Sequence, residues 1–312
     1  MLQRTIKKSV RVTGIGVHSG KEANATLHPA HPGHGIAFIR SDLSNGERVT
    51  ANYENVVDTR MATTIARGST KISTIEHLMA ALYGAGIDNC LIEVDGPEVP
   101  ILDGSSAQFT RAIQSVGTDT QTQPRTFLAL RKKVEVKAGE KWAYAEPSDT
   151  LRLHSTIEWD HPVIGYQEFS YVEGESDFGE IAGARTFGFL RDVEAMWKMG
   201  LARGGSLDNA VVLDEARVLN PGGLRYADEF VRHKVLDALG DLKLSGFHLQ
   251  AHVRLHRSGH DIHRLLLAEI LKDASNYDLL TMPGHLAVEE GERKRSKLRS
   301  VLQRATRVAA SF

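Results

Sequence analysis

One stretch of the chain places a histidine and two aspartates at intervals that suit shared chemistry. His233, Asp237 and Asp241 are four residues apart within residues 230–242, whose apolar spacing predicts a helix. Residues four apart lie on one side of a helix, and a histidine and a carboxylate one turn apart can bind the same metal ion. The other side of this helix is apolar, so a solvated surface helix is the simpler explanation of the pattern taken alone.

A second candidate is the adjacent pair Glu76 and His77, at the start of an expected helix over residues 75–83. Ser73 followed by Glu76 is the sequence signature of a capping box, which would explain the glutamate without any catalytic role. The same pair also suits hydrolytic zinc chemistry, in which the histidine binds the metal and its neighbour acts as a general base toward water. Both roles need the same carboxylate, and the sequence leaves both open.

The segment around His260 could supply an acid or a further ligand. Gly259 predicts a tight turn, with His260 at the start of a helix over residues 260–272. The helix dipole lowers the basicity of an imidazole there, and a carboxylate such as Asp241 would restore it. We expect the neighbouring His256 and His263 to be surface residues.

The hydroxyl of Thr186 completes the set of candidate groups. Residues 184–189 read Ala-Arg-Thr-Phe-Gly-Phe, which predicts a strand with Phe187 and Phe189 toward a core. Each signal is weak to moderate alone. Together the candidates supply the groups needed for zinc-dependent hydrolysis of an amide, with three protein ligands leaving a fourth zinc position for water.

Composition limits the class of protein. The chain has 312 residues, of which 41% are hydrophobic and 25% charged, and its net charge of −1 argues against a general nucleic-acid-binding surface. The single cysteine, Cys90, excludes an internal disulfide and cysteine-rich zinc sites, and we expect it to be a buried, inert thiol. Residues 1–8 lack the apolar core of a signal peptide, and no apolar run approaches a membrane span. We therefore expect a cytoplasmic protein.

The order of the expected elements indicates two similar halves. In each half a histidine-bearing helix is followed by glycine and then by a strand, at residues 76–94 and 233–255. We expect an α+β fold of two similar domains, each a β-sheet layered with helices, joined by a polar linker at residues 117–124. The expected domains are 1–122 and 126–284, with insertions at 30–46 and 192–223, and a basic extension over 285–312.

Several segments resemble one family in residues, order and spacing. They are Ser-Thr-Ile-Glu-His-Leu at 73–78, residues 184–189 and 231–241, Ser-Gly-His at 258–260, and residues 13–20 and 98–105. With them the chain resembles the UDP-3-O-acyl-N-acetylglucosamine deacetylases from about residue 3 to about residue 280. These are zinc enzymes of the committed step in lipid A biosynthesis.

The resemblance implies a role for each candidate residue. It implies that Zn²⁺ is bound by His77, His233 and Asp237, and that Glu76 is the general base. His260, held by Asp241, would be charged and would stabilise the oxyanion or protonate the leaving amine. The hydroxyl of Thr186 would donate to the oxyanion, and Lys234 would contact oxygens or phosphates of the substrate.

The resemblance also implies the substrate and where it binds. The substrate would be a UDP-sugar carrying an acyl chain, with no nucleic acid involved, and we expect a monomer. An apolar passage for the acyl chain would lie in the insertion after Asp192. The implied substrate-binding residues are Met61, Phe187, Val193, Ala202, Leu207, Ala210, Val212 and Lys234.

Three alternatives remain open at this point. A zinc amidase acting on a different acylated substrate would share the metal-binding residues and differ in the apolar passage. A binding or regulatory protein without catalytic activity would leave the helix stripe solvated. A role linked to nucleic acid would use the basic residues after position 290.

Overall fold

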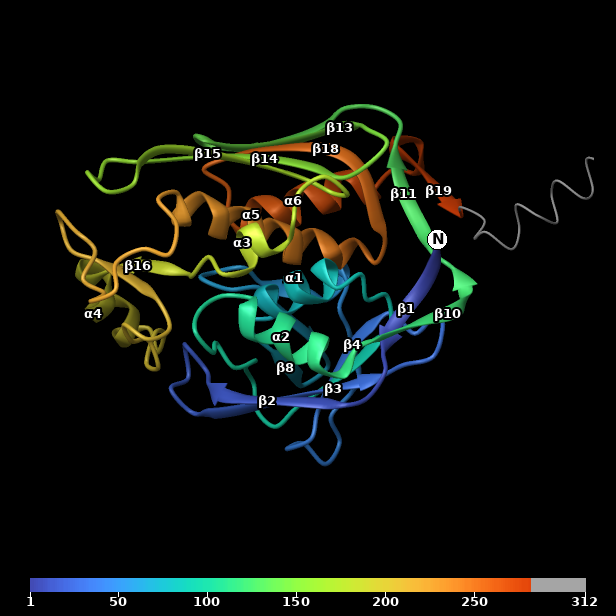
Figure 1. The fold of residues 1–312 in the computed structure, drawn as a ribbon, viewed down its shortest axis with the longest axis horizontal. Helices are drawn as coiled ribbons and strands as arrows, with labels where there is room; N and C mark the ends of the chain where they lie inside the picture. The colour runs from blue at the N-terminus through green and yellow to red at the C-terminus, as the bar shows by residue number, and fades with distance from the viewer. Residues whose placement is uncertain (282–312) are drawn as a thin grey trace, which may run out of the picture.

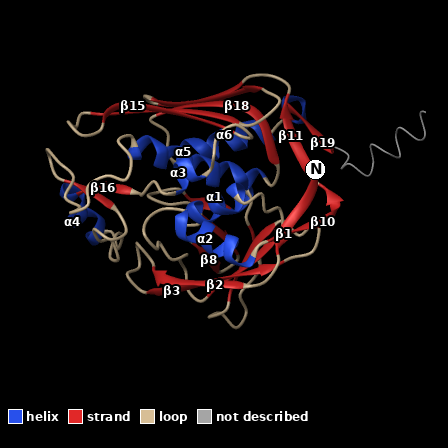
Figure 2. Ribbon diagram, in the orientation of Figure 1, coloured by secondary structure: helices blue, strands red, loops and turns tan. Residues whose placement is uncertain are grey.

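The computed structural model describes residues 1–281, and these form two sheet-and-helix halves that pack through their helices. The layers run from one sheet through two layers of helices to the second sheet (Figures 1 and 2). The expected α+β class with two similar halves is confirmed. The basic extension expected over residues 285–312 lies outside the described residues. Within residues 1–281, no helix is long and apolar enough to cross a membrane.

The first half is built on a five-stranded sheet in the order β2-β3-β9-β4-β5. A separate three-stranded sheet, β6-β7-β8, lies beside it, and helices α1 and α2 cover the main sheet (Figure 1). The bounds are β2 (Val10–Ile15), β3 (Glu22–Pro29), β4 (Ile36–Arg40), β5 (Val49–Thr50), η1 (Tyr53–Asn55), β6 (Val56–Asp58), β7 (Thr64–Arg67), β8 (Thr70–Ile72), α1 (Glu76–Gly84), β9 (Cys90–Val94) and α2 (Ala107–Val116).

The second half is built on a seven-stranded sheet in which β18 pairs with β11, β13 and β14. Helices α5 and α6 cover its inner face (Figure 1). The bounds are β11 (Thr126–Leu130), β12 (Val134–Ala138), β13 (Lys141–Pro147), β14 (Arg152–Trp159), β15 (Gly165–Val172), α3 (Gly179–Ala182), α5 (Glu229–Leu242), η2 (Lys243–Ser245), β18 (His248–His256), α6 (His260–Leu271), η3 (Ala274–Asn276) and β19 (Tyr277–Thr281).

The expected repeat of a histidine-bearing helix, a glycine and a strand is present in both halves. In the first half α1 leads through a glycine turn into β9, and in the second α5 leads through Gly246 into β18. Strand β9 runs parallel to β4 and antiparallel to β3, and β18 runs parallel to β11 and β14 and antiparallel to β13. Helix α1 packs on α5 and thereby joins both halves in one hydrophobic core.

A small unit projects from the second half. Strands β16 (Phe187–Phe189) and β17 (Val211–Leu213) pair in parallel, with helix α4 (Leu190–Lys198) between them in the chain. The unit lies at the edge of the molecule in Figure 1, and α4 has no buried residue. It covers most of the insertion expected at 192–223 but begins earlier, at Phe187.

Two expectations about segment boundaries are wrong. The polar segment 117–124 is not an irregular linker but largely strand β10 (Thr118–Pro124), which pairs antiparallel with β1 (Leu2–Ile6). No residue of β10 is buried, so the segment has no hydrophobic alternation for sequence analysis to detect. The insertion expected at 30–46 contains β4, whose buried Ile36, Ala37 and Phe38 belong to the main sheet.

Candidate functional site

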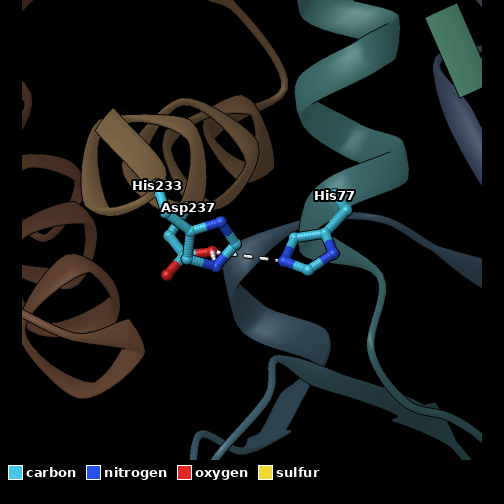
Figure 3. A group of neighbouring side chains, drawn as sticks. All are labelled: His77, His233 and Asp237. Atoms are coloured by element: carbon cyan, nitrogen blue, oxygen red, sulfur yellow. Dashed lines mark ion pairs between the residues drawn. The ribbon is translucent and has the colours of Figure 1, made fainter. Parts of the chain in front are cut away.

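The three predicted ligands meet where α1 contacts α5. His77 lies in the first turn of α1, and His233 and Asp237 lie one turn apart on α5. Oδ1 of Asp237 is 3.5 Å from Nε2 of His77 and 3.3 Å from Nε2 of His233. All three side chains are buried and converge on one point between the helices (Figure 3). The two halves therefore each supply part of one cluster.

The hydrogen bonding of this cluster fits a bound cation. Nδ1 of His233 lies 3.0 Å from the Ala184 carbonyl, which can only accept, so Nδ1 carries the hydrogen and Nε2 presents a lone pair. Desolvation outweighs the attraction of Asp237 and lowers the pKa of His233 to about 3, so the imidazole is neutral. Its lone pair faces Oδ1 of Asp237, a buried carboxylate oxygen without a hydrogen-bond donor. Two lone pairs turned toward each other suit a metal ion between them, and this N, N, O set suits Zn²⁺.

Lys234 holds the other oxygen of the same carboxylate. Its Nζ lies 2.8 Å from Oδ2 of Asp237 and 5.5 Å above the ring of Phe187. Burial opposes the charge of Asp237, but its polar and cationic neighbours, Lys234 among them, outweigh it and hold the pKa of Asp237 well below its usual range. Lys234 thus orients the carboxylate so that Oδ1 remains directed at the two histidines.

Glu76 does not cap its helix. Helix α1 has Ile75 at its N-cap with no side-chain bond, and the hydroxyl of Ser73 contacts Thr64 instead. Oε2 of Glu76 accepts a hydrogen bond from the backbone N–H of Thr63, at 3.0 Å. The capping box proposed from the sequence is therefore wrong. Burial raises the pKa of Glu76, which suits a group that must take up a proton.

His260 is held at the start of α6 by Asp241. Nδ1 of His260 lies 2.7 Å from Oδ2 of Asp241, and its Nε2 lies 3.8 Å from Oε1 of Glu76. Desolvation opposes a charge on His260, but the carboxylates of Asp241 and Glu76 outweigh it and raise its pKa to about 10. His260 is therefore an imidazolium at neutral pH, with its N–H directed toward Glu76.

The surface position expected for His263 is wrong, and that expected for His256 holds only in part. His263 is fully buried and bonds Asp241 through Nδ1 and Ser258 through Nε2. His256 is half-buried, stacked on Trp142 and bonded to Thr156. Asp241, Trp142 and Thr156 come from distant parts of the chain, so these contacts cannot be read from local sequence.

The crossing of the two helices depends on Gly240. This residue lies on α5 against the backbone of Glu76, and a β-carbon there would overlap the Glu76 carbonyl. With glycine, α1 approaches α5 closely enough for Glu76 and His77 to reach the side chains of α5. The close contact thus sets the distance between the general-base candidate and the ligand candidates.

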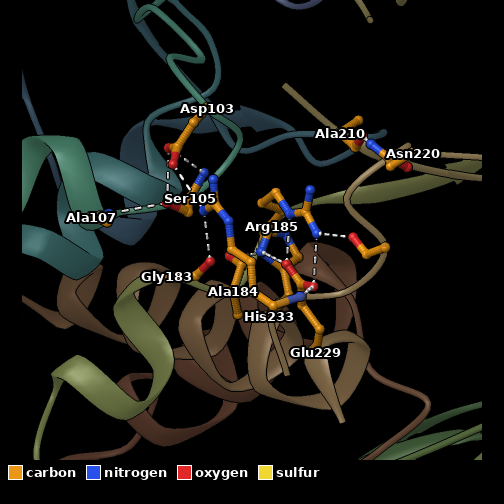
Figure 4. A network of polar contacts seen from close by, with 12 residues as sticks. Asp103, Ser105, Ala107, Gly183, Ala184, Arg185, Ala210, Asn220, Glu229 and His233 are labelled. Carbon is orange, nitrogen blue, oxygen red and sulfur yellow. Dashed lines mark hydrogen bonds and ion pairs between the residues drawn. The ribbon is translucent and has the colours of Figure 1, made fainter. Parts of the chain in front are cut away.

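An ion pair fixes the segment that carries Thr186. Nε and Nη2 of Arg185 lie 2.8 Å and 3.0 Å from the two carboxylate oxygens of Glu229, which is fully buried (Figure 4). In the same segment, the Ala184 carbonyl accepts a hydrogen bond from His233, and the N–H of Thr186 donates one to the Gly104 carbonyl. The pair therefore positions Thr186 beside the metal-ligand candidates.

A cavity of about 520 Å³ joins these groups to the projecting unit. Its polar end is lined by Glu76, His77, Thr186, His233, Lys234, Asp237 and His260. All the other residues predicted to bind substrate line the cavity as well. Phe187 lies against Lys234, and an apolar end is formed by residues farther along the projecting unit: Val193, Ala202, Leu207, Ala210 and Val212, with Met61 also in the lining. Among the predicted site residues, only Asp241 is set back from this cavity, because it lies behind His260.

Several contributors escaped sequence analysis. Thr63 links Glu76 to Asp241: its N–H donates a hydrogen bond to the Glu76 carboxylate, and its hydroxyl donates one to the Asp241 carboxylate at 2.5 Å. The backbone carbonyl of Ala184 orients His233, which no residue type can signal. His263 alone carried a clue, because it lies three residues after His260 on the same helix and so faces a similar direction.

Known proteins with similar sequences identify the family of the chain. The sequence model of the family described as UDP-3-O-acyl N-acetylglycosamine deacetylase matches residues 3–272. The chain is 50% identical to the UDP-3-O-acyl-N-acetylglucosamine deacetylase of Myxococcus xanthus (strain DK1622), over 89% of each chain. It is 48% identical to that of Geobacter sp. (strain M21), over 90% of this chain and 92% of the relative. The chain therefore belongs to the UDP-3-O-acyl N-acetylglycosamine deacetylase family.

Proposed function

We propose that the protein hydrolyses the acetamide of UDP-3-O-(3-hydroxyacyl)-N-acetylglucosamine, giving acetate and UDP-3-O-acyl-glucosamine in the committed step of lipid A biosynthesis. Zn²⁺ is the cofactor, with His77, His233 and Asp237 as its ligands. One observation carries the proposal: neutral His233 turns its lone pair toward an undonated oxygen of Asp237, at the polar end of a cavity whose other end is apolar. Family membership supports the same reaction.

Zn²⁺ held by His77, His233 and Asp237 would supply Lewis acidity: it would polarise the amide carbonyl and lower the pKa of a water molecule to about 7. The side chains around the metal site carry out the proton transfers and stabilise the developing charge. Glu76 takes a proton from the water as its oxygen attacks the carbonyl carbon, and its raised pKa favours holding that proton.

Two donors stabilise the charge that develops on the carbonyl oxygen. The Thr186 hydroxyl and the His260 imidazolium both line the polar end of the cavity, where a donor to an oxyanion is worth about 3–4 kcal/mol. As the carbon–nitrogen bond breaks, the amine nitrogen takes a proton from His260 or from protonated Glu76. Lys234 contacts oxygens of the sugar or its phosphates.

The apolar end of the cavity accounts for the acyl chain. Val193, Leu207 and Val212 line it, and the projecting unit supplies most of its wall. An acyl chain on the sugar oxygen next to the acetamide would extend away from the polar end. This arrangement distinguishes the proposed function from that of a zinc amidase with a different substrate.

Zinc content and substrate choice test the proposal together. We expect near-stoichiometric zinc in the wild-type protein and a clear loss in Asp237→Ala, measured by metal analysis. UDP-N-acetylglucosamine with the 3-O-acyl chain should be hydrolysed far faster than the same sugar without it. Equal rates on the two substrates would favour the amidase alternative, and wild-type protein without zinc would favour a binding protein.

We also propose a monomer that works in the cytoplasm. One chain supplies the ligand candidates from both halves, so the site is complete in a single copy. Cys90 is an unpaired buried thiol, which suits a reducing compartment. Light scattering at micromolar concentration should give the mass of one chain, and a dimer mass would contradict the first part.

A further inference from the structure

The carboxylate of Asp241 is the meeting point of three donors. Oδ1 accepts a hydrogen bond from the Thr63 hydroxyl at 2.5 Å. Oδ2 accepts hydrogen bonds from Nδ1 of His260 and from Nδ1 of His263, both at 2.7 Å. Asp241 is 3% exposed and His263 is fully buried, so no solvent competes for these bonds. His260 has been assigned a role in the reaction, whereas His263 has none.

The hydrogen positions follow from the partners. Burial opposes ionisation of Asp241, but His260 and His263 outweigh it and hold the Asp241 pKa below its usual range, so the carboxylate only accepts. Both histidines must then carry a hydrogen on Nδ1. On its far side, Nε2 of His263 lies 3.0 Å from the hydroxyl of Ser258. The Ser258 contact therefore holds the imidazole of His263 in place behind Asp241.

Ser258, His263 and Asp241 have the order of contacts found in a serine hydrolase triad, yet a nucleophilic role does not fit. Ser258 is 5% exposed and does not line the cavity that holds the candidate catalytic groups. A substrate carbonyl could not reach its hydroxyl. The chain of contacts instead ends at His260 and Glu76, on the side of Asp241 that faces the cavity.

We propose that His263 is a positioning residue for the deacetylation: its Nδ1–H holds the Asp241 carboxylate so that His260 keeps Nε2 directed at Glu76. Thr63 anchors Oδ1 and His263 anchors Oδ2, so the carboxylate cannot turn about its own bond. His260 is then the only one of the three donors that faces the reacting groups. This inference rests on the proposed function of the same site.

Two amide substitutions separate position from chemistry. The amide N–H of His263→Asn lies near the position of Nδ1 and can still donate to Asp241. The amide N–H of His263→Gln lies near the position of Nε2, where it meets Ser258 instead of Asp241. His263→Leu removes the donor altogether. We expect Gln and Leu to lower kcat about tenfold with KM nearly unchanged, and Asn to recover most of the loss. Assays use the zinc-loaded full chain and the acylated UDP-sugar.

A buried histidine elsewhere provides the matched control. His248 is 3% exposed and bonds a different carboxylate, Asp88, at 2.9 Å, away from the cavity. His248→Leu should lower the melting temperature without a comparable loss of kcat in the folded fraction. Zinc content should be the same in all variants, because His263 does not contact the ligand candidates.

The outcomes separate this inference from the function on which it rests. A wild-type chain that fails to hydrolyse the acylated sugar contradicts the proposed function. A wild-type chain that is active, with Asn and Gln variants of equal kcat, contradicts only the role of His263. A loss of kcat in His248→Leu as large as in His263→Leu would also overturn it, because the effect would then be one of general stability.

Discussion

The helix crossing and the projecting unit border the same cavity but are built in opposite ways. At the crossing of α1 and α5, residues Glu76 to Tyr83 are all buried, and the charged groups there bond one another. In the projecting unit, α4 has no buried residue, and Trp197 is 54% exposed. The chemistry is therefore held by dense polar packing, whereas the part of the apolar wall that α4 supplies is lightly packed.

This difference separates two requirements of one enzyme. Groups that move protons must be placed closely, and a buried network with few free rotamers does that. A wall that receives an acyl chain needs apolar surface more than fixed geometry. Substitutions at the crossing should therefore change turnover and folding, and those in the unit should change substrate binding.

Glu76→Gln should produce the largest effect and is the strongest challenge to this division. The amide fills the same space but cannot take a proton, so kcat should fall by about 10²–10⁴ while zinc stays bound. Steady-state kinetics and metal analysis on the same preparation test this. Full activity in Glu76→Gln would show that this residue of the helix crossing takes no part in the reaction.

The second effect concerns pH. Activity needs Glu76 ionised and His260 protonated, so it should fall in acid and again as pH rises toward about 10, the raised pKa of His260. Asp241→Asn removes the charge that keeps His260 protonated, and the alkaline limb should then move to lower pH. Profiles of kcat/KM for both proteins test the shift. An unchanged alkaline limb would mean that another group sets it.

Gly240→Ala tests the close contact itself. The added methyl would overlap the Glu76 carbonyl, and overpacking of this kind costs about 1–3 kcal/mol of unfolding free energy. Turnover should fall as well, because Glu76 moves away from α5. Gly222→Ala is the control, since a β-carbon there meets no atom within 4 Å. Urea denaturation should separate the two variants.

The smallest effect is expected in the projecting unit. Trp197 lines the cavity while half exposed, so Trp197→Ala should raise KM for long acyl chains up to about tenfold and leave stability nearly unchanged. Met199, which is 66% exposed and does not line the cavity, supplies the control variant Met199→Ala. A large loss of kcat in Trp197→Ala would contradict the division, because the projecting unit would then affect turnover as the helix crossing does.

Sequence analysis predicted the elements that carry a strong periodic signal. Helices α1, α5 and α6 begin and end within two residues of the expected positions, and the expected order of histidine-bearing helix, glycine and strand recurs in both halves. Strands β10 and β4 were misassigned, because β10 buries no residue and β4 follows a segment rich in proline, glycine and histidine. Edge pairing and strand order depend on contacts that local sequence does not show.

Some side chains of the site could be predicted from local sequence, and others could not. The spacing of His233, Asp237 and Asp241 put them on one side of a helix, where the structure has them, but could not say that this side is buried. The resemblance to the family supplied the roles proposed for them. Thr63 and His263 were missed because their partners lie far away in the chain, and Ser73 to Glu76 matched a local motif that tertiary contacts override.

The burial of α1 against α5 has a consequence for the synthesis of the chain. The N-terminal half leaves the ribosome first, with His77 already in place and the face of α1 that will meet Gly240 still uncovered. Until α5 emerges, this half exposes one face of an apolar helix and only one of the three ligand candidates, His77. A truncated product would therefore be both inactive and prone to aggregate, and the metal centre can form only late in translation.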